Sequence, residues 1–462
     1  MKEDRKISEP VSIDYITKNR LQAEDEAIHG WYRFVLGYPP HLVSEYLQVL
    51  QADVDRDWVF DPFCGTATTP VEARLKGFST ICSDANPISI LAARVKLLWE
   101  INLSIIQSRL PLIIELASEC LEHVNLTPIP NENLQLSLFY PQFTIKNNKR
   151  NRTFEGFNPE TLLPAKSTAL IPTGFISQKP LLRCLAIRYA IDNIVPENDI
   201  SDFMRLALAN VLVKDAGNVG FGPEVYRLAP KLDVNVLGAF SNTVNRMIDD
   251  LTVIHQKISP PFPSANIFLE DARTLIALKN QPAIGIVITS PPYPNEKDYT
   301  RSTRLENVVL GLLSSKEDLR NLKSNLLRSN TRNVFFKDDD DSYIQDIPSI
   351  SLLADSIELM RLKLGKTSGF ERLYHRVTRL YFGGMYRHFV SLFPNLRPGA
   401  RCAYVVGDQM SFFRIPIKTA HLLADVALKA GFNVEGIQLW RTRRSTTTGL
   451  ELEENVLILR HP

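Results

Sequence analysis

The stretch Asp61-Pro62-Phe63-Cys64-Gly65-Thr66-Ala67 decides the fold, because it connects a short apolar strand at residues 57–60 to a helical pattern at residues 68–76. A second predicted strand, residues 78–83, ends in Asp84. A strand, a glycine turn, a helix and a strand ending in an acid about 20 residues later form the nucleotide-binding α/β unit. Gly65 would let a ligand approach the backbone, and Asp84 would accept hydrogen bonds from ribose hydroxyls. A turn glycine can also serve packing alone, and this alternative stays open.

A second stretch, Thr289-Ser290-Pro291-Pro292-Tyr293, follows an apolar run at residues 283–289 that predicts a buried strand. Prolines carry no backbone N–H, so the carbonyls of Ser290 and Pro291 form an acceptor-rich notch. The Ser290 hydroxyl and the Tyr293 ring complete a site for a planar heterocycle with an amino group, such as unstacked cytosine or adenine. Holding both N–H bonds would aim the nitrogen lone pair, which is catalysis by positioning. The alternative is a proline-stiffened strand exit with an aromatic plug.

The composition excludes several classes of protein. The 462 residues include 53 Lys plus Arg and 51 Asp plus Glu, so a nucleic-acid surface must be a local patch. Five scattered cysteines without a CxxC pair indicate reduced thiols rather than disulfides or a zinc site, and we expect no metal. Residues 1–20 lack the apolar segment of a signal peptide, and no apolar run approaches a membrane span. A cytoplasmic protein without membrane contact is therefore expected.

The order of predicted elements indicates an α/β domain interrupted by a helical insertion. Residues 1–126 supply the first part of the domain, residues 127–263 a mainly helical lobe, and residues 264–462 the second part. We expect the lobe to carry recognition rather than chemistry, and we interpret its glycine-rich residues 217–222 as a loop. Near the C-terminal end, residues 433–460 predict an antiparallel hairpin on an otherwise parallel sheet.

Five basic side chains are candidates for phosphate contacts in a nucleic acid. They are Lys149, Arg150 and Arg152 in the insertion, and Arg301 and Arg304 after the second stretch. The first three lie between Phe143 and Phe154, a mixture of basic and aromatic residues that contacts phosphates and bases. The alternative for this cluster is a solvated loop.

Acidic residues occur at two further places of interest. Asp271 follows a third predicted strand, where it could accept a hydrogen bond from an adenine amino group or simply cap a helix. The run of four aspartates at residues 338–341 is predicted to be a solvated loop, and its charge makes it an unlikely contact with a DNA groove.

Together, the stretches from Asp61 to Thr66 and from Thr289 to Tyr293 resemble the amino-group DNA methyltransferases that use S-adenosyl-L-methionine. The resemblance implies a Rossmann-like class I methyltransferase fold with a seven-stranded, mostly parallel sheet. It also implies the roles of individual residues. The cofactor-binding residues would be Asp61, Pro62, Phe63, Gly65 and Thr66 beside the methionine part, Asp84 at the ribose and Asp271 at the adenine, while Ser290, Pro291, Pro292 and Tyr293 would form the catalytic loop.

The implied reaction is transfer of a methyl group to the exocyclic amine of a base flipped out of double-stranded DNA. In this family a serine at position 290 is typical of cytosine-N4 enzymes, whereas an aspartate or asparagine there marks adenine-N6 enzymes. The aromatic turn near Tyr38 resembles the family's additional cofactor-side motif. Cys64 is not expected to be a nucleophile, because it lies in the cofactor turn and attack by an amine needs no thiolate.

Three other functions remain as alternatives to the cytosine-N4 enzyme. They are an adenine-N6 DNA methyltransferase, an RNA base methyltransferase, and a non-catalytic nucleic-acid-binding protein on the same scaffold. A modification role beside a matching restriction endonuclease would fit either DNA methyltransferase, the cytosine-N4 enzyme or the adenine-N6 enzyme.

Overall fold

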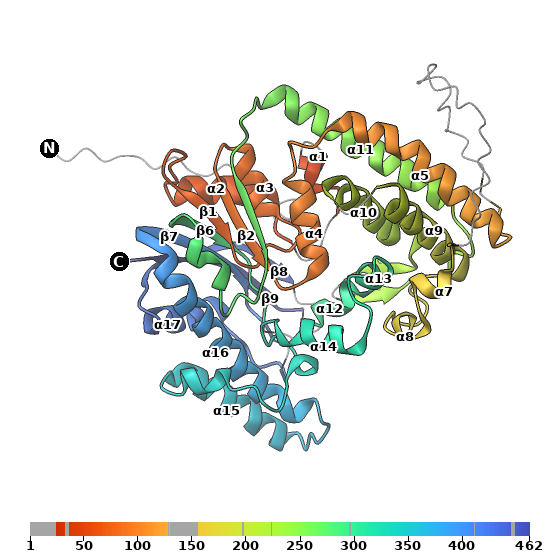
Figure 1. Ribbon diagram of the computed structural model, residues 1–462. Helices are drawn as coiled ribbons and strands as arrows, with labels where there is room; N and C mark the ends of the chain where they lie inside the picture. Colours follow the sequence, from red (N-terminus) through yellow and green to blue (C-terminus); the bar gives the residue numbers. More distant parts are fainter. Residues whose placement is uncertain are drawn as a thin grey trace.

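A seven-stranded sheet forms the centre of the molecule in this computed structural model (Figure 1). The structure describes residues 25–32, 37–127, 129, 156–195, 198–222, 224–294, 297–410, 412–444 and 449–462. The strands lie in the order β5-β2-β1-β6-β7-β9-β8. Their bounds are β1 Trp58–Asp61, β2 Thr80–Asp84, β5 Ala265–Leu269, β6 Ile284–Thr289, β7 Leu396–Gly407, β8 Asn433–Arg444 and β9 Glu451–Arg460. The predicted Rossmann-like class I methyltransferase fold is confirmed.

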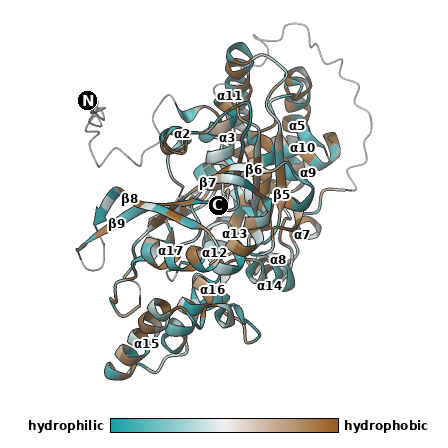
Figure 2. Cartoon of the chain, turned by 90° about the vertical axis from the view of Figure 1, so that its left-hand side faces the viewer, coloured by the Kyte–Doolittle hydropathy of each residue, from teal (hydrophilic) through white to brown (hydrophobic). Residues whose placement is uncertain are grey.

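The antiparallel part of the sheet differs in detail from the expected hairpin. Strand β9 pairs antiparallel with both β7 and β8, whereas β5, β2, β1, β6 and β7 pair in parallel. The hairpin is therefore present, but its second strand lies between β7 and β8. Pairing of β7 with β9 ends at Gly407 and Glu454, while β8 and β9 continue as a two-stranded ribbon that projects from the sheet (Figure 2).

Helices cover both faces of the sheet, so its central strands are apolar throughout. All six residues of β6 are buried, and the side chains at residues 286–288 alternate between the two apolar layers. Figure 1 shows α2, α3 and α4 on one side, and α15, α16 and α17 on the other. The bounds are α2 Pro40–Val49, α3 Thr68–Leu75, α4 Pro87–Lys96, α15 Pro348–Lys363, α16 Tyr374–Leu392 and α17 Thr419–Lys429.

Helix α5, Leu103–His123, packs against the helices of the inserted segment. Its apolar face belongs to one continuous core, which also includes Val71 and Ile88 on the sheet side and Leu305 after the second stretch. The boundary expected at residue 127 stays a prediction. The main lobe helices are α5, α9 Gln178–Ile194, α10 Asp199–Val211 and α11 Val236–Lys257. Shorter helices are α1 Glu26–His29, α7 Pro159–Leu162, α8 Ala165–Thr168, α12 Tyr299–Ser302, α13 Arg304–Val309 and α14 Lys316–Ser324.

The interpretation of residues 217–222 as a loop is wrong. Residues Val219–Phe221 form strand β3, which pairs antiparallel with β4, Val225–Arg227. The three glycines of this segment hid a strand of only three residues, in which the Tyr226 ring packs where a side chain of residue 220 would lie.

All five cysteines are buried free thiols, as predicted. No helix in the described ranges is long and apolar enough to cross a membrane. Those ranges also contain no group of three or more His, Cys, Asp or Glu side chains placed to hold a metal ion.

Candidate active site

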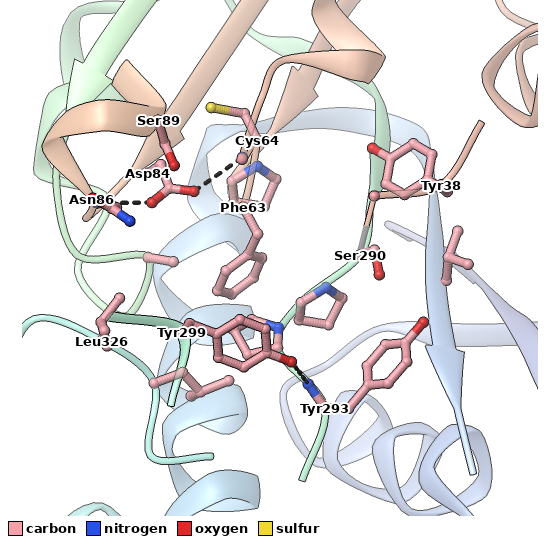
Figure 3. Close-up of a pocket in the computed structure, with 18 of the residues that line it drawn as sticks. Tyr38, Phe63, Cys64, Asp84, Asn86, Ser89, Ser290, Tyr293, Tyr299 and Leu326 are labelled. Carbon is pink, nitrogen blue, oxygen red and sulfur yellow. Dashed lines mark hydrogen bonds between the residues drawn. The ribbon is translucent and has the colours of Figure 1, made fainter. Parts of the chain in front are cut away.

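The two stretches singled out in the sequence line one cavity of about 310 Å³. It lies at the carboxyl ends of β1, β2 and β6, which is where open α/β sheets bind their ligands. Gly65 contributes to its wall from the first stretch, and Pro291 from the second. Figure 3 shows Asp84 and Asn86 on one side of the view and Ser290 and Tyr293 on the other. The predicted site residues in the wall are Pro62, Phe63, Gly65, Thr66, Asp84, Asp271, Ser290, Pro291, Pro292 and Tyr293.

The glycine turn is bound to the end of β2 through Asp84. The backbone N–H groups of Gly65 and Asn86 donate to its two carboxylate oxygens at 3.0 and 2.8 Å (Figure 3). Burial raises the pKa of Asp84 to about 6, although these backbone hydrogen bonds oppose the shift. Gly65 has φ +49°, and a side chain there would meet no atom within 4 Å, so its Cα faces open space. Ala67 also has positive φ, +66°, so the turn accepts a methyl group in the left-handed region.

Asp61 occupies a different place from the other residues of its turn, because it does not belong to the cavity wall. It is buried and accepts hydrogen bonds from the Tyr38 hydroxyl at 2.9 Å, the Thr289 hydroxyl at 2.5 Å and the Phe63 N–H at 3.1 Å. Burial raises its pKa to about 6, and these three donors oppose the shift. Asp61 therefore joins the ends of β1 and β6, and it brings Tyr38, which does line the cavity, onto the same carboxylate.

The second stretch leaves β6 with its side chains fixed by neighbours. The Tyr293 N–H donates to the Tyr299 hydroxyl at 3.4 Å, and Ser290 lines the same part of the cavity wall. Burial, followed by the nearby Glu454 carboxylate, raises the pKa of Tyr293 well above its ordinary value, so the phenol stays neutral. The Tyr293 ring packs on Gly407, where an added Cβ would lie 2.9 Å from Cε2. The notch, the hydroxyl and the ring face are thus held together in one arrangement.

Asp271 forms an ion pair instead of capping a helix. Its carboxylate accepts from the Arg273 N–H at 2.9 Å and from Arg273 Nη2 at 2.6 Å. Arg273 in turn donates through Nη1 to Asp340 at 2.8 Å and through Nη2 to the Ser324 carbonyl at 2.6 Å. The second oxygen of Asp340 accepts from Arg387 Nη1 at 2.5 Å.

The prediction that the acidic run is a solvated loop is wrong for two of its four residues. Asp340 is 2% exposed and bridges two arginines, and Asp338 pairs with Arg328 at 2.8 Å. The acidic run can lie against α16 because residue 383 of that helix is a glycine. An added Cβ at Gly383 would lie 1.9 Å from the Asp340 carbonyl oxygen. The acids are thus neutralised by arginines that the local sequence does not contain.

Lys96 is a residue of the site that sequence reasoning missed. Its ammonium group is buried and donates to the carbonyls of His29 at 3.1 Å, Tyr32 at 2.7 Å and Thr66 at 2.9 Å. It therefore binds the turn at residues 29–32 to the glycine turn that lines the cavity. The signal was a lysine inside an apolar helical run, because a buried ammonium needs three acceptors.

We expect Lys96→Met to lower the free energy of unfolding by about 2 kcal/mol, because three buried carbonyls lose their donor. The methionine keeps the apolar stem, so the loss reports the hydrogen bonds rather than packing. Urea unfolding measures it, with Lys76→Met as the control, since Lys76 is exposed at the end of a neighbouring helix. An equal, small change in both variants would contradict a clamping role for Lys96.

Other wall residues come from segments that carried no recognisable motif. They are Trp440, Arg441 and Arg443 of β8, Glu454 of β9, and Lys297, Tyr299 and Asn325 after the second stretch. Arg441 Nε donates to Glu454 at 2.5 Å, and Arg443 Nε lies 3.4 Å from the other oxygen of the same carboxylate. Their position depends on the register of β8 against β9, which is not visible in either strand alone.

The basic residues predicted to contact phosphates lie in different environments. Arg301 is half-exposed and pairs with Glu224 at 3.6 Å. Arg304 is buried, and its guanidinium donates to the carbonyl and the hydroxyl of Thr300 at 3.2 and 2.7 Å. The predicted cluster of Lys149, Arg150 and Arg152 lies outside the described residues.

Comparison with curated proteins gives similarity along most of the chain. The Type II methyltransferase M.BsoBI of Geobacillus stearothermophilus is 24% identical over 449 residues, which cover 92% of this chain and 82% of that protein. The similarity supports a methyltransferase family. The Type II methyltransferase M.AvaI of Nostoc sp. is 25% identical over 190 residues, which cover 40% of this chain and 38% of that protein. No protein-family model matches the chain.

Two solved structures have weak similarity to this methyltransferase-like chain. TrmN from Thermus thermophilus has a TM-score of 0.29 and 10% identity, covering 92% of this chain and 49% of that one. The rRNA methyltransferase aviRa from Streptomyces viridochromogenes has a TM-score of 0.30 and 11% identity, covering 95% and 94%. Scores this low carry no argument, and the fold assignment depends on the strand order of the sheet.

Proposed function

We propose that the protein transfers a methyl group from S-adenosyl-L-methionine to the exocyclic amine of a base in double-stranded DNA, with cytosine N4 as the favoured acceptor. The observation that carries this proposal is the single cavity lined by both Gly65 and Pro291. A donor held at the glycine turn and an amine held at the proline notch would meet there. Similarity to two Type II methyltransferases along the chain supports the same reaction class.

The residues present fit the proposed cofactor. Each oxygen of Asp84 accepts one backbone hydrogen bond, so the carboxylate keeps lone pairs for two ribose hydroxyls. Gly65 leaves open space at its Cα, and the half-buried carboxylate of Asp271 lies in the same wall. The cofactor would supply an electrophilic methyl group on a sulfonium sulfur. Asp61 does not line the cavity, and it would contribute by holding Tyr38, Phe63 and the end of β6 in place.

The chain's own residues would prepare the amine for in-line attack. The hydroxyl of Ser290 and the carbonyl of Pro291 would accept its two N–H bonds, and the Tyr293 ring would hold the base in plane. Serine at position 290 can both donate to a ring nitrogen and accept from the amine. Both bases offer such a ring nitrogen beside the amine, so cytosine N4 is favoured only because a serine at position 290 is typical of the cytosine-N4 enzymes that the two stretches resemble, and adenine N6 remains the runner-up. The proton lost from the amine would pass to solvent or to Ser290.

We expect cofactor affinity to depend on pH through Asp84. Its pKa is raised to about 6, so the carboxylate becomes protonated as the pH falls below that value and loses acceptor capacity. The dissociation constant for S-adenosyl-L-methionine should therefore rise roughly tenfold between about pH 7 and pH 5, as the linkage of binding to one proton requires. Calorimetry with Asp84→Asn is the matched control, because this variant should bind weakly with little pH dependence. A pH profile of the same slope in both proteins would contradict the role of Asp84.

Methylation-sensitive sequencing of DNA from cells that express the protein tests the proposal. Modified bases at one recurring sequence are expected, and nucleoside analysis then identifies N4-methylcytosine or N6-methyladenine. Cells that express Ser290→Ala are the control for host modification. Methyl groups found in RNA alone, or no new modification and no cofactor binding, would overturn the proposal. A cytoplasmic modification role that protects DNA from a partner restriction endonuclease would fit a recurring methylated sequence.

A further inference from the structure

Phe336 is the most exposed large apolar side chain of the described residues, with 94% of its surface accessible. Its neighbour Phe335 is only half-exposed and packs beside the guanidinium groups of Arg320 and Arg328, at 5.8 and 5.2 Å from the ring centre. Two adjacent phenylalanines thus point in opposite senses, one to the protein and one to solvent. An aromatic ring left fully in water forgoes the burial that normally stabilises it.

The turn that carries Phe336 is fixed by hydrogen bonds. Arg376 Nη2 donates to the carbonyls of Phe335, Phe336 and Asp338 at 3.4, 3.3 and 3.1 Å. The Asp338 carboxylate accepts from the Phe335 N–H at 2.6 Å, and the Asp338 N–H donates back to the Phe335 carbonyl at 3.2 Å. The exposure of Phe336 is therefore imposed by the backbone of its turn.

The turn that carries Phe336 is connected to the wall of the cavity through ion pairs. Asp338 pairs with Arg328, whose Nη1 donates to the carbonyl of Leu326, a wall residue. Close by in the chain, Asp340 pairs with the wall residue Arg273. Both connections are buried or nearly so, which ties the position of Phe336 to that of the cavity.

Cationic side chains lie near Phe336 in the chain. Lys337 follows it directly, Arg332 precedes it by four residues, and both are exposed. Two of the four acids that follow, Asp338 and Asp340, are neutralised in ion pairs, so the run contributes less negative charge than its sequence implies. An exposed ring on a fixed turn, connected by ion pairs to the wall of a cavity that would take a single base, matches a nucleic-acid contact more closely than a protein one.

We propose that Phe336 inserts into the duplex beside the target base and stacks on its neighbours, which stabilises the flipped state. This inference rests on the proposed function, because it requires a base extruded from DNA. Apolar side chains that wedge between base steps partly offset the cost of unstacking. Phe336 would then act on extrusion and not on methyl transfer itself.

Two duplexes test the role of Phe336, both containing the sequence identified by methylation sequencing. In the first the target base is paired, and in the second it faces an abasic site and needs little energy to leave the stack. We expect Phe336→Ala to lower kcat/KM roughly tenfold on the paired duplex and less than about twofold on the abasic one, as the loss of one stacking contact implies. Phe336→Trp should retain activity on both duplexes.

Phe370→Ala is the matched control, since Phe370 is another exposed phenylalanine, with 56% of its surface accessible. It should leave both rates unchanged. Equal losses of kcat/KM on the two duplexes with Phe336→Ala would overturn the insertion of Phe336 and indicate a general DNA contact. No loss of kcat/KM on either duplex would also overturn it and would indicate a protein partner instead. If the unchanged protein methylates neither duplex, the proposed function itself fails, and that result is distinct from a variant effect.

Discussion

Ser290→Ala is expected to lower the rate of methyl transfer at least about a hundredfold, the usual loss when one preorganised hydrogen-bonding group is removed from a reacting centre. The substitution removes the side-chain acceptor of the notch and leaves the Pro291 carbonyl in place. Cofactor affinity should stay within about twofold, because Ser290 and Asp84 are contributed by different strands. Single-turnover transfer of a tritiated methyl group, with calorimetry for the cofactor, separates the two effects.

Tyr293 provides the companion variants. Tyr293→Ala removes the ring that packs on Gly407 and should abolish transfer as well. Tyr293→Phe keeps the ring and loses only the hydroxyl, so it should retain most of the activity. Turnover like that of the unchanged protein in both Ser290→Ala and Tyr293→Ala would remove the basis for a base site at this loop.

Asp340→Asn is expected to destabilise the fold by about 3–5 kcal/mol, the cost of leaving a buried ion pair without one partner. The amide is the same size as the carboxylate, but it removes the negative charge that pairs with both Arg273 and Arg387 and leaves Arg273 with Asp271 alone. Cofactor affinity should fall too, because Arg273 holds Asp271 in the cavity wall. Urea unfolding measures the first effect and calorimetry the second.

The adjacent Asp339 provides the control, since it is exposed and Asp339→Asn should change stability by less than about 0.5 kcal/mol. The pH dependence follows from the same ion pairs. Burial alone would raise the pKa of Asp340, but Arg273 and Arg387 outweigh it and hold the pKa below its ordinary value. The stabilisation is thus complete above about pH 4, the pKa of an unfolded aspartate, and is lost as the pH falls through the lower folded value. Equal stabilities of the two variants at neutral pH would contradict this account.

The predictable parts of the fold are those whose structure follows from the residues of a single segment. The apolar run that became β6 is buried on both faces, so its sequence alone indicates a central parallel strand. The turns after β1 and β6 were recognisable because glycine and proline restrict the backbone in known ways. The same reasoning failed for β3, which has only three residues, one of them Gly220, and lies between Gly217 and Gly222.

Some residues of the cavity wall could be anticipated from the sequence, and others depend on pairing between segments that are far apart in the chain. Ser290 and Asp84 lie at strand ends, where chemistry is expected, but Arg443 and Glu454 reach the wall through the register of β8 and β9. Asp340 appeared to be a solvent-facing acid because its partners lie 67 and 47 positions away. A pair of adjacent glycines in α16 was the available sign, since a helix tolerates them where another backbone must approach closely.

The place of β9 has a consequence for synthesis on the ribosome. Strand β9 fills the gap between β7 and β8, both of which leave the exit tunnel before it. Until Glu451–Arg460 has been translated, the nascent chain exposes an unpaired edge of β7, the kind of template on which other chains can add a strand. The sheet is therefore completed late, and chaperone protection of that edge during translation would benefit this molecule more than one whose strands join in order of emergence.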